Sequence, residues 1–166
     1  NDGSGNVTVN NDLYASNGDI SLKGWDIIIS NSEVSAIKGS GTVTFTIDAA
    51  HDVQVNGSDI GTVMNGAGNA LTQVNAGNNI IARDEGGNFS SVSSTVNGNG
   101  NAEVNIEAGK KSDTVSELSI DNSFVVAKVK GEGEASVKIY NDNGAVSLNG
   151  TETEALIANG AETAKI

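Results

Sequence analysis

The sequence contains neither proline nor cysteine, and only 4% of its 166 residues are aromatic. Proline cannot donate a backbone hydrogen bond to a strand ladder, so a chain built of stacked strands has reason to exclude it. The absence of cysteine excludes disulfides, thiolate nucleophiles and cysteine-ligated zinc. Few aromatics and a hydrophobic fraction of 37% leave little material for a thick core.

Basic residues are also scarce, with 9 Lys and Arg against 21 Asp and Glu, which gives a net charge of −12. Such a surface repels nucleic acid, because proteins bind phosphates with Lys and Arg. No stretch approaches the roughly 18 apolar residues of a membrane span. We therefore expect no nucleic-acid partner and no membrane insertion. The chain starts without Met and without a basic-then-apolar leader, so we expect a mature or excised fragment.

The clearest internal signal is a repeat. Asp19–Ile27 (DISLKGWDI) aligns without a gap with Asp52–Ile60 (DVQVNGSDI), and Ala145–Glu152 is a weaker third copy. Asn79–Asp84 keeps only the beginning of the pattern. The alignment predicts that Asp19 and Asp52 stack on successive units.

Short alternating strands precede these copies, and the units start near residues 7, 43, 71, 104 and 137. Joints rich in Asn and Gly close them, as at 39–41, 65–69 and 97–101. A short strand gains stability when the equivalent strand stacks on it at about 4.8 Å.

The spacing predicts a single all-β domain over residues 1–166, a right-handed parallel β-helix of about five irregular coils. Residues 152–166 are a candidate terminal cap, either a helix or a last coil. Antiparallel β-sandwich modules are the alternative fold. Exposed strand edges at the ends of a solenoid predict end-to-end self-association.

Three runs, Gly18–Gly24, Asp52–Ile60 and Asn75–Ala82, resemble the degenerate repeats of filamentous-haemagglutinin-like exoproteins, which bacteria export by two-partner secretion. The resemblance implies a β-helical shaft on the cell surface or in a biofilm matrix. Its implied task is adhesion or the display of a distal domain. The Asn-Pro motifs of that family's secretion domain are absent from a chain without proline, so the resemblance implies an internal segment.

Four aspartates, Asp19, Asp26, Asp52 and Asp59, are candidates for paired catalytic carboxylates, as in glycosidases. Each lies just before Ile or Val at the start of a strand, where a side-chain oxygen can instead accept backbone N–H groups and shape a turn. The other copies carry Asn79 or Ala145 at the first of these positions, a change that a turn role tolerates. We therefore predict no catalytic residue.

Calcium is the one cofactor to consider, since stacked Asp and Asn turns gather oxygen ligands. The best local oxygen clusters are Asp142 with Asn143, and Asp84 with Glu85. A plain surface turn is the alternative at both places.

Histidine occurs once, at His51, which excludes a metal cage built of several histidines and leaves a surface histidine as the simplest interpretation. Trp25 is the only tryptophan, and the second copy has Ser58 in its place. An exposed indole can stack on a sugar ring, and Tyr14 and Tyr140 are candidates to extend that platform. A packed corner aromatic is the alternative.

These observations predict a non-catalytic structural or adhesive segment of a secreted bacterial surface protein. Its expected partners are host or bacterial surface glycans or proteins. A carbohydrate-binding or carbohydrate-active β-helix, as in tailspikes and lyases, is the second hypothesis. A calcium-stabilised adhesin is the third.

Overall fold

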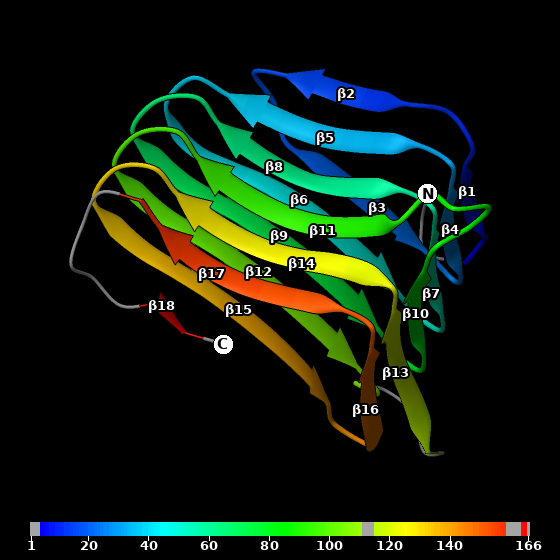
Figure 1. Ribbon diagram of the computed structural model, residues 1–166. Coiled ribbons are helices and arrows are strands. Elements are labelled where there is room, and N and C mark those ends of the chain that lie inside the picture. The colour runs from blue at the N-terminus through cyan, green and yellow to red at the C-terminus, as the bar shows by residue number, and fades with distance from the viewer. Residues whose placement is uncertain (1–3, 111–114, 159–163, 166) are drawn as a thin grey trace.

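The computed structural model describes residues 4–110, 115–158 and 164–165, and its strands form three parallel sheets of six strands each (Figure 1). Successive strands along the chain go to sheets A, B and C in turn, so three strands make one coil and the strands of each sheet stack along one axis. The predicted parallel β-helix is confirmed, and the β-sandwich alternative is wrong. Six coils are present, where about five were expected.

Each sheet takes one strand from every coil. Sheet A contains β1 (Val7–Val9), β4 (Ile27–Ser30), β7 (Val53–Asn56), β10 (Ile80–Arg83), β13 (Ser116–Asp121) and β16 (Gly144–Asn149). Sheet B contains β2 (Leu13–Ser16), β5 (Glu33–Lys38), β8 (Asp59–Met64), β11 (Ser90–Val96), β14 (Ser123–Val129) and β17 (Glu152–Ile157). Sheet C contains β3 (Ile20–Gly24), β6 (Gly41–Ala49), β9 (Gly68–Ala76), β12 (Gly100–Ala108), β15 (Gly133–Asn141) and β18 (Ala164–Lys165).

The core consists of columns of aliphatic side chains that run along the axis. Alternate residues of each strand point inward, and in-register pairing places Ile27, Val53 and Ile80 directly above one another. The middle coils thus bury about two apolar side chains per strand in sheet A and up to four in sheet C. This economy explains how a chain with few hydrophobic and aromatic residues buries a continuous core.

The repeat units predicted from the sequence correspond to sheet C in four of five cases. Residues 43, 71, 104 and 137 lie in β6, β9, β12 and β15, whereas residue 7 lies in β1 of sheet A. The predicted stacking of Asp19 on Asp52 is wrong. Asp19 precedes β3 of sheet C, and Asp52 precedes β7 of sheet A, where its in-register neighbour is Asp26.

Two of the three corners have a backbone signature of their own. Between sheets B and C, Gly68, Gly100 and Gly133 stack at φ near 150° or 145°, and a Cβ on any one of the three would overlap the glycine of the preceding coil. At four corners between sheets A and B, a single residue with positive φ links the strands and is Asn or Gly: Asn31, Gly57, Asn122 and Gly150. A hydroxyl residue follows it; Ser58 Oγ, for example, donates to the Asn56 carbonyl at 2.8 Å.

The candidate cap at residues 152–166 begins as a regular strand, because β17 pairs in register with β14. Residues 159–163 and 166 lie outside the described residues, so the rest of that prediction is not addressed. Within the described residues there is no helix long and apolar enough to cross a bilayer.

Candidate functional site

One corner between sheets A and B departs from the regular geometry. Asn56 and Ser58 are separated by Gly57 alone, whereas their in-register partners Arg83 and Ser90 are separated by residues 84–89. The insertion folds into a small hairpin in which the backbones of Glu85 and Asn88 exchange hydrogen bonds of 2.9 and 3.1 Å. Gly86 and Gly87, at φ of 63° and 86°, form its two-residue turn.

The inserted hairpin lies against the preceding coils. A Cβ built on Gly57 would lie 3.1 Å from the Glu85 Cβ atom and 3.3 Å from the Asn88 Cβ atom, so glycine at this corner permits the close approach. The side-chain amide of Asn31 donates to Glu85 Oε2 at 3.4 Å. The hairpin therefore folds back over the corner residues of the two preceding coils and does not extend freely into solvent.

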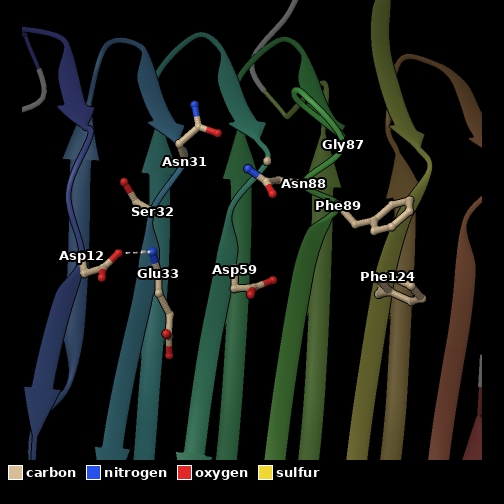
Figure 2. A pocket seen from close by; sticks show the side chains of 10 residues that line it. Asp12, Asn31, Ser32, Glu33, Asp59, Gly87, Asn88, Phe89 and Phe124 are labelled. Carbon is tan, nitrogen blue, oxygen red and sulfur yellow. Dashed lines mark hydrogen bonds between the residues drawn. The ribbon is translucent and has the colours of Figure 1, made fainter.

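A hollow of about 540 Å³ lies beside the hairpin, in the size range of small-ligand sites (Figure 2). Asp12, Glu33 and Asp59 form a row along one side, because they precede or begin β2, β5 and β8 at the same in-register position. Phe89 and Phe124 form the other side, with ring centroids 5.8 Å apart in an edge-to-face arrangement. Phe89 is 55% exposed, so its ring is available for contact.

The surroundings of Asp59 disfavour its ionised form. Burial, and then the charge of Glu33, raises the pKa of Asp59. The Asp12 carboxylate accepts the backbone N–H of Glu33 at 2.8 Å. The hydroxyl of Tyr14 donates to Glu33 Oε2 at 2.7 Å, which raises the pKa of Tyr14 to about 12. Among the described residues that line the hollow there is no Lys or Arg, so its charge is uniformly negative.

The three aromatic residues predicted to form a platform are dispersed. Trp25 lies at the corner between β3 and β4, Tyr14 lies in β2 of sheet B, and Tyr140 lies in β15 of sheet C. All three are exposed, at 49%, 49% and 42%. Only Tyr14 contacts a residue of the hollow.

The four predicted oxygen ligands are also divided between two places. Asp84 and Glu85 belong to the inserted hairpin, whereas Asp142 and Asn143 lie at the corner between β15 and β16. The backbone N–H of Asn143 donates to Asn141 Oδ1 at 3.2 Å, as in an ordinary Asx turn. Neither pair is part of a group of three converging acidic or histidine side chains in the described parts of the chain.

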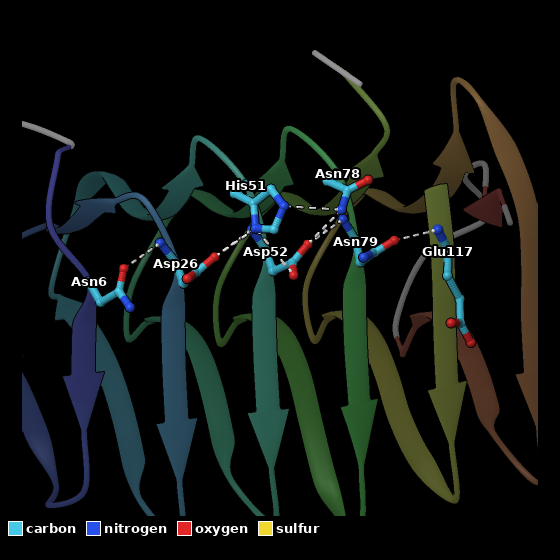
Figure 3. A network of polar contacts seen from close by, with 7 residues as sticks. All are labelled: Asn6, Asp26, His51, Asp52, Asn78, Asn79 and Glu117. Carbon is cyan, nitrogen blue, oxygen red and sulfur yellow. Dashed lines mark hydrogen bonds and ion pairs between the residues drawn. The ribbon is translucent and has the colours of Figure 1, made fainter. Parts of the chain in front are cut away.

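A converging group does occur at the corner between sheets C and A (Figure 3). His51 Nδ1 lies 2.9 Å from Asp26 Oδ1 and 3.3 Å from Asp52 Oδ2. The imidazole stacks on the Trp25 indole with centroids 5.4 Å apart and planes at 9°. Trp25 is thus a packed corner aromatic that keeps an exposed face.

The same corner carries a ladder of side-chain to backbone hydrogen bonds. Oxygens of Asp26, Asp52 and Asn79 accept the N–H groups of Asp52, Asn79 and Glu117 at 3.2, 3.0 and 2.8 Å (Figure 3). This is the turn role that sequence reasoning assigned to aspartates before strands. It is found for Asp26 and Asp52. Asp19 likewise accepts a backbone N–H from the next coil, that of Thr44 at 2.8 Å, and it also accepts from the Lys38 side chain.

Sequence reasoning missed the hollow and the His51 group. In the sequence, residues 84–89 read as a surface turn with oxygen ligands, and nothing local shows that they pack against Gly57. Strand register brings Asp26 and Asp52 to His51, and local sequence does not reveal register. Comparisons with family models, curated proteins and solved structures give no match for this chain, so its function must be argued from its own geometry.

Proposed function

We propose that this chain is a non-catalytic β-helical segment of a secreted bacterial surface or matrix protein, and that it contributes to adhesion by binding a surface glycan. The observation that carries the proposal is the hollow beside the inserted hairpin. There, an aromatic wall faces a row of carboxylates on an otherwise regular stack of coils. Rigid scaffolds commonly carry binding residues on such irregular loops.

The chemistry of the hollow suits a sugar. Ionised carboxylates accept hydrogen bonds and donate none, and sugar hydroxyls supply the missing donors. The exposed ring of Phe89 offers an apolar surface for the C–H face of a sugar ring, an interaction of the kind that aromatic side chains make with flat apolar groups.

The negative charge of the hollow disfavours acidic glycans. A uronic or sialic acid would bring its carboxylate toward Asp12, Glu33 and Asp59 without a cation to offset the repulsion. A neutral glycan avoids that cost, and the ammonium of an amino sugar would pair with the row. The proposal is therefore restricted to neutral or amino glycans.

Calorimetric titration of the purified chain tests the proposal. The probes are neutral chito-oligosaccharides, chitosan oligomers as amino glycans, and oligogalacturonates as acidic ones. We expect binding to the neutral or amino probes only, and binding about tenfold weaker in Phe89→Ala. Tyr140→Ala is the matched control, because it removes an exposed aromatic residue from another sheet. Absence of binding, or binding that survives Phe89→Ala and Phe124→Ala, would contradict the proposal.

Trp25→Ala tests whether a glycan binds at the Trp25 corner or in the hollow. A platform at Trp25 predicts loss of binding in this variant, whereas the hollow predicts no change because Trp25 is not among its lining residues. Exposure on the producing cell is checked separately, by antibody labelling and protease treatment of intact cells.

Glycan cleavage is a second candidate function, favoured by one observation. Glu33 and Asp59 are in-register neighbours on parallel strands, which places two carboxylate side chains next to each other, and retaining glycosidases use two neighbouring carboxyl groups. The raised pKa of Asp59 suits a proton donor. Reducing ends released by the unmodified chain, and lost in Asp59→Asn and Glu33→Gln with binding retained, would support cleavage. Binding without product would leave adhesion as the function.

A further inference from the structure

We propose that Asp26, His51 and Asp52 form a binding site for a divalent transition-metal ion, with Zn²⁺ as the expected occupant. The site lies at the corner between sheets C and A and does not depend on the glycan proposal, since none of these residues lines the hollow.

The distances fit a metal with little rearrangement. One ligand atom from each side chain lies within 4.8 Å of the others, and His51 Nδ1 lies 2.9 and 3.3 Å from the two carboxylate oxygens. In a tetrahedral zinc site with bonds of about 2.0–2.1 Å, ligand atoms are separated by roughly 3.3 Å. Two sides of the triangle, at 2.9 and 3.3 Å, are close to that value and the third is within 4.8 Å, so small side-chain rotations complete three ligand positions and leave the fourth for water.

The ladder at this corner fixes the ligands before any ion arrives. Asp26 Oδ1 accepts the Asp52 N–H at 3.2 Å, and Asp52 Oδ1 accepts the Asn79 N–H at 3.0 Å. Asp52 Oδ2 remains directed at the imidazole. Hydrogen bonds of this kind orient metal ligands in established sites. The stacked Trp25 ring holds the imidazole plane in place from one side.

The charge of the three ligand side chains and their donor atoms determine which ion is preferred. Two carboxylates and a neutral imidazole carry a charge of −2, which a divalent cation neutralises and a proton on the imidazole only halves. A nitrogen donor favours Zn²⁺, Ni²⁺ or Cu²⁺ over Ca²⁺ and Mg²⁺, which prefer all-oxygen ligands. The side chains of His51, Asp26 and Asp52 remain 42%, 27% and 24% exposed, so an ion can reach them from solvent.

Coordination through Nδ1 also has a proton requirement. The Nδ1 proton must leave, and the neutral ring then carries its proton on Nε2. The side-chain amide nitrogen of Asn78 lies 3.4 Å from Nε2 and also donates to Asp52 Oδ1 at 3.1 Å. This amide must therefore turn to present its oxygen to Nε2, and Asp52 Oδ1 then keeps the Asn79 N–H as its donor. In the competing arrangement without metal, Nδ1 keeps its proton and donates to Asp26.

Trp25 provides a direct readout, because it is the only tryptophan and stacks on the proposed ligand. Titration of the full chain with NiCl₂ should quench its fluorescence to saturation at one equivalent. Calorimetric titration with ZnCl₂ should give the same stoichiometry. His51→Gln keeps a polar side chain but removes the ligating nitrogen, and Asp52→Asn keeps the ladder acceptor but removes a charge. Both should weaken Zn²⁺ binding at least about tenfold.

Asp121→Asn is the matched control, since it removes the same charge from a half-buried carboxylate outside the group; it should bind Zn²⁺ as the unmodified chain does. Absence of saturable binding at one equivalent, or unchanged affinity in folded His51→Gln, would overturn the proposal. Binding of Ca²⁺ as tight as that of Zn²⁺ would also overturn it, because it would indicate an oxygen-only site.

Discussion

A side-chain oxygen of Asp26 accepts the backbone N–H of Asp52, its counterpart in the next coil, at 3.2 Å. The same relationship joins Asp52 to Asn79 at 3.0 Å and Asn79 to Glu117 at 2.8 Å. Each rung satisfies an N–H at the point where a strand of sheet A begins. The rung requires an acceptor and no charge, which explains why both Asp and Asn occupy this column.

The ladder predicts different outcomes for two substitutions at one position. Asp52→Ala leaves the Asn79 N–H without its partner and should lower the free energy of unfolding by about 1 kcal/mol. Asp52→Asn keeps an acceptor oxygen and should stay within about 0.5 kcal/mol of the unmodified chain. Equilibrium denaturation in urea measures both. Equal losses in the two variants would mean that charge, and not the hydrogen bond, matters at this rung.

The stacked glycines between sheets B and C predict that alanine is destabilising at a stacked glycine and tolerated at an unstacked one. In Gly100→Ala, the new Cβ would overlap the Gly68 carbonyl oxygen at a backbone φ of 145°, so we expect a loss of about 3 kcal/mol or more, or failure to fold. Gly39→Ala is the control, because a Cβ there meets no atom within 4 Å and φ is ordinary. That variant should unfold at the same urea concentration or a slightly higher one. Similar losses in both would contradict the stacking argument.

The sequence was sufficient to predict the fold class but not the register. Strand alternation, Asn and Gly joints and the lack of proline follow from local backbone physics, so they predicted a parallel stack. The pairing of Asp19 with Asp52 failed because β3 and β7 both follow an aspartate and both alternate, although they belong to different sheets.

The glycines at the corners between sheets B and C predict which strands pair, whereas the Asp-Ile runs do not. Asp52 follows Gly41 by 11 residues (52 − 41), and Asn79 follows Gly68 by 11 residues (79 − 68). Counting from these corners places Asp52 and Asn79 in one column. The hollow was beyond reach for another reason: it depends on how an inserted hairpin packs on Gly57, and no local pattern encodes that contact.

Ionisation of Asp59 should lower the free energy of unfolding of the protein. Burial and Glu33 raise its pKa, so above about pH 4, where the unfolded chain ionises, it contributes unfavourably to stability. That cost is relieved as pH falls through the folded pKa. Asp59→Asn should therefore raise the melting temperature at pH 7, and the gain should shrink as the pH is lowered.

Asp19→Asn should change the melting temperature in the opposite direction. The Lys38 side chain and the Thr44 N–H lower the pKa of Asp19, so its favourable contribution is present above about pH 4 and is lost as pH falls through the folded pKa. This variant should melt lower at pH 7 and approach the unmodified chain in acid. Melting curves from pH 7 to pH 2.5 compare the two, and parallel pH profiles would contradict the assigned environments.

The last coil predicts self-association of the 166-residue chain. Val146 and Leu148 continue the core columns of Leu118 and Ile120, yet they are 41% and 45% exposed where their partners are fully buried. Apolar columns that end in solvent gain free energy when another surface covers them. We expect sedimentation velocity to show association that rises with concentration, and Leu148→Lys to abolish it.

A lysine substitution in the first coil distinguishes head-to-tail stacking from the pairing of two last coils. Leu13 lies in β2 of the first coil and is 40% exposed. Head-to-tail stacking uses both ends and extends into filaments, so Leu13→Lys should weaken it as Leu148→Lys does. A closed pair that joins two last coils would lose association only in Leu148→Lys and would stop at a dimer. A chain that sediments as a monomer at millimolar concentration would show that the exposed column ends are not sufficient for association.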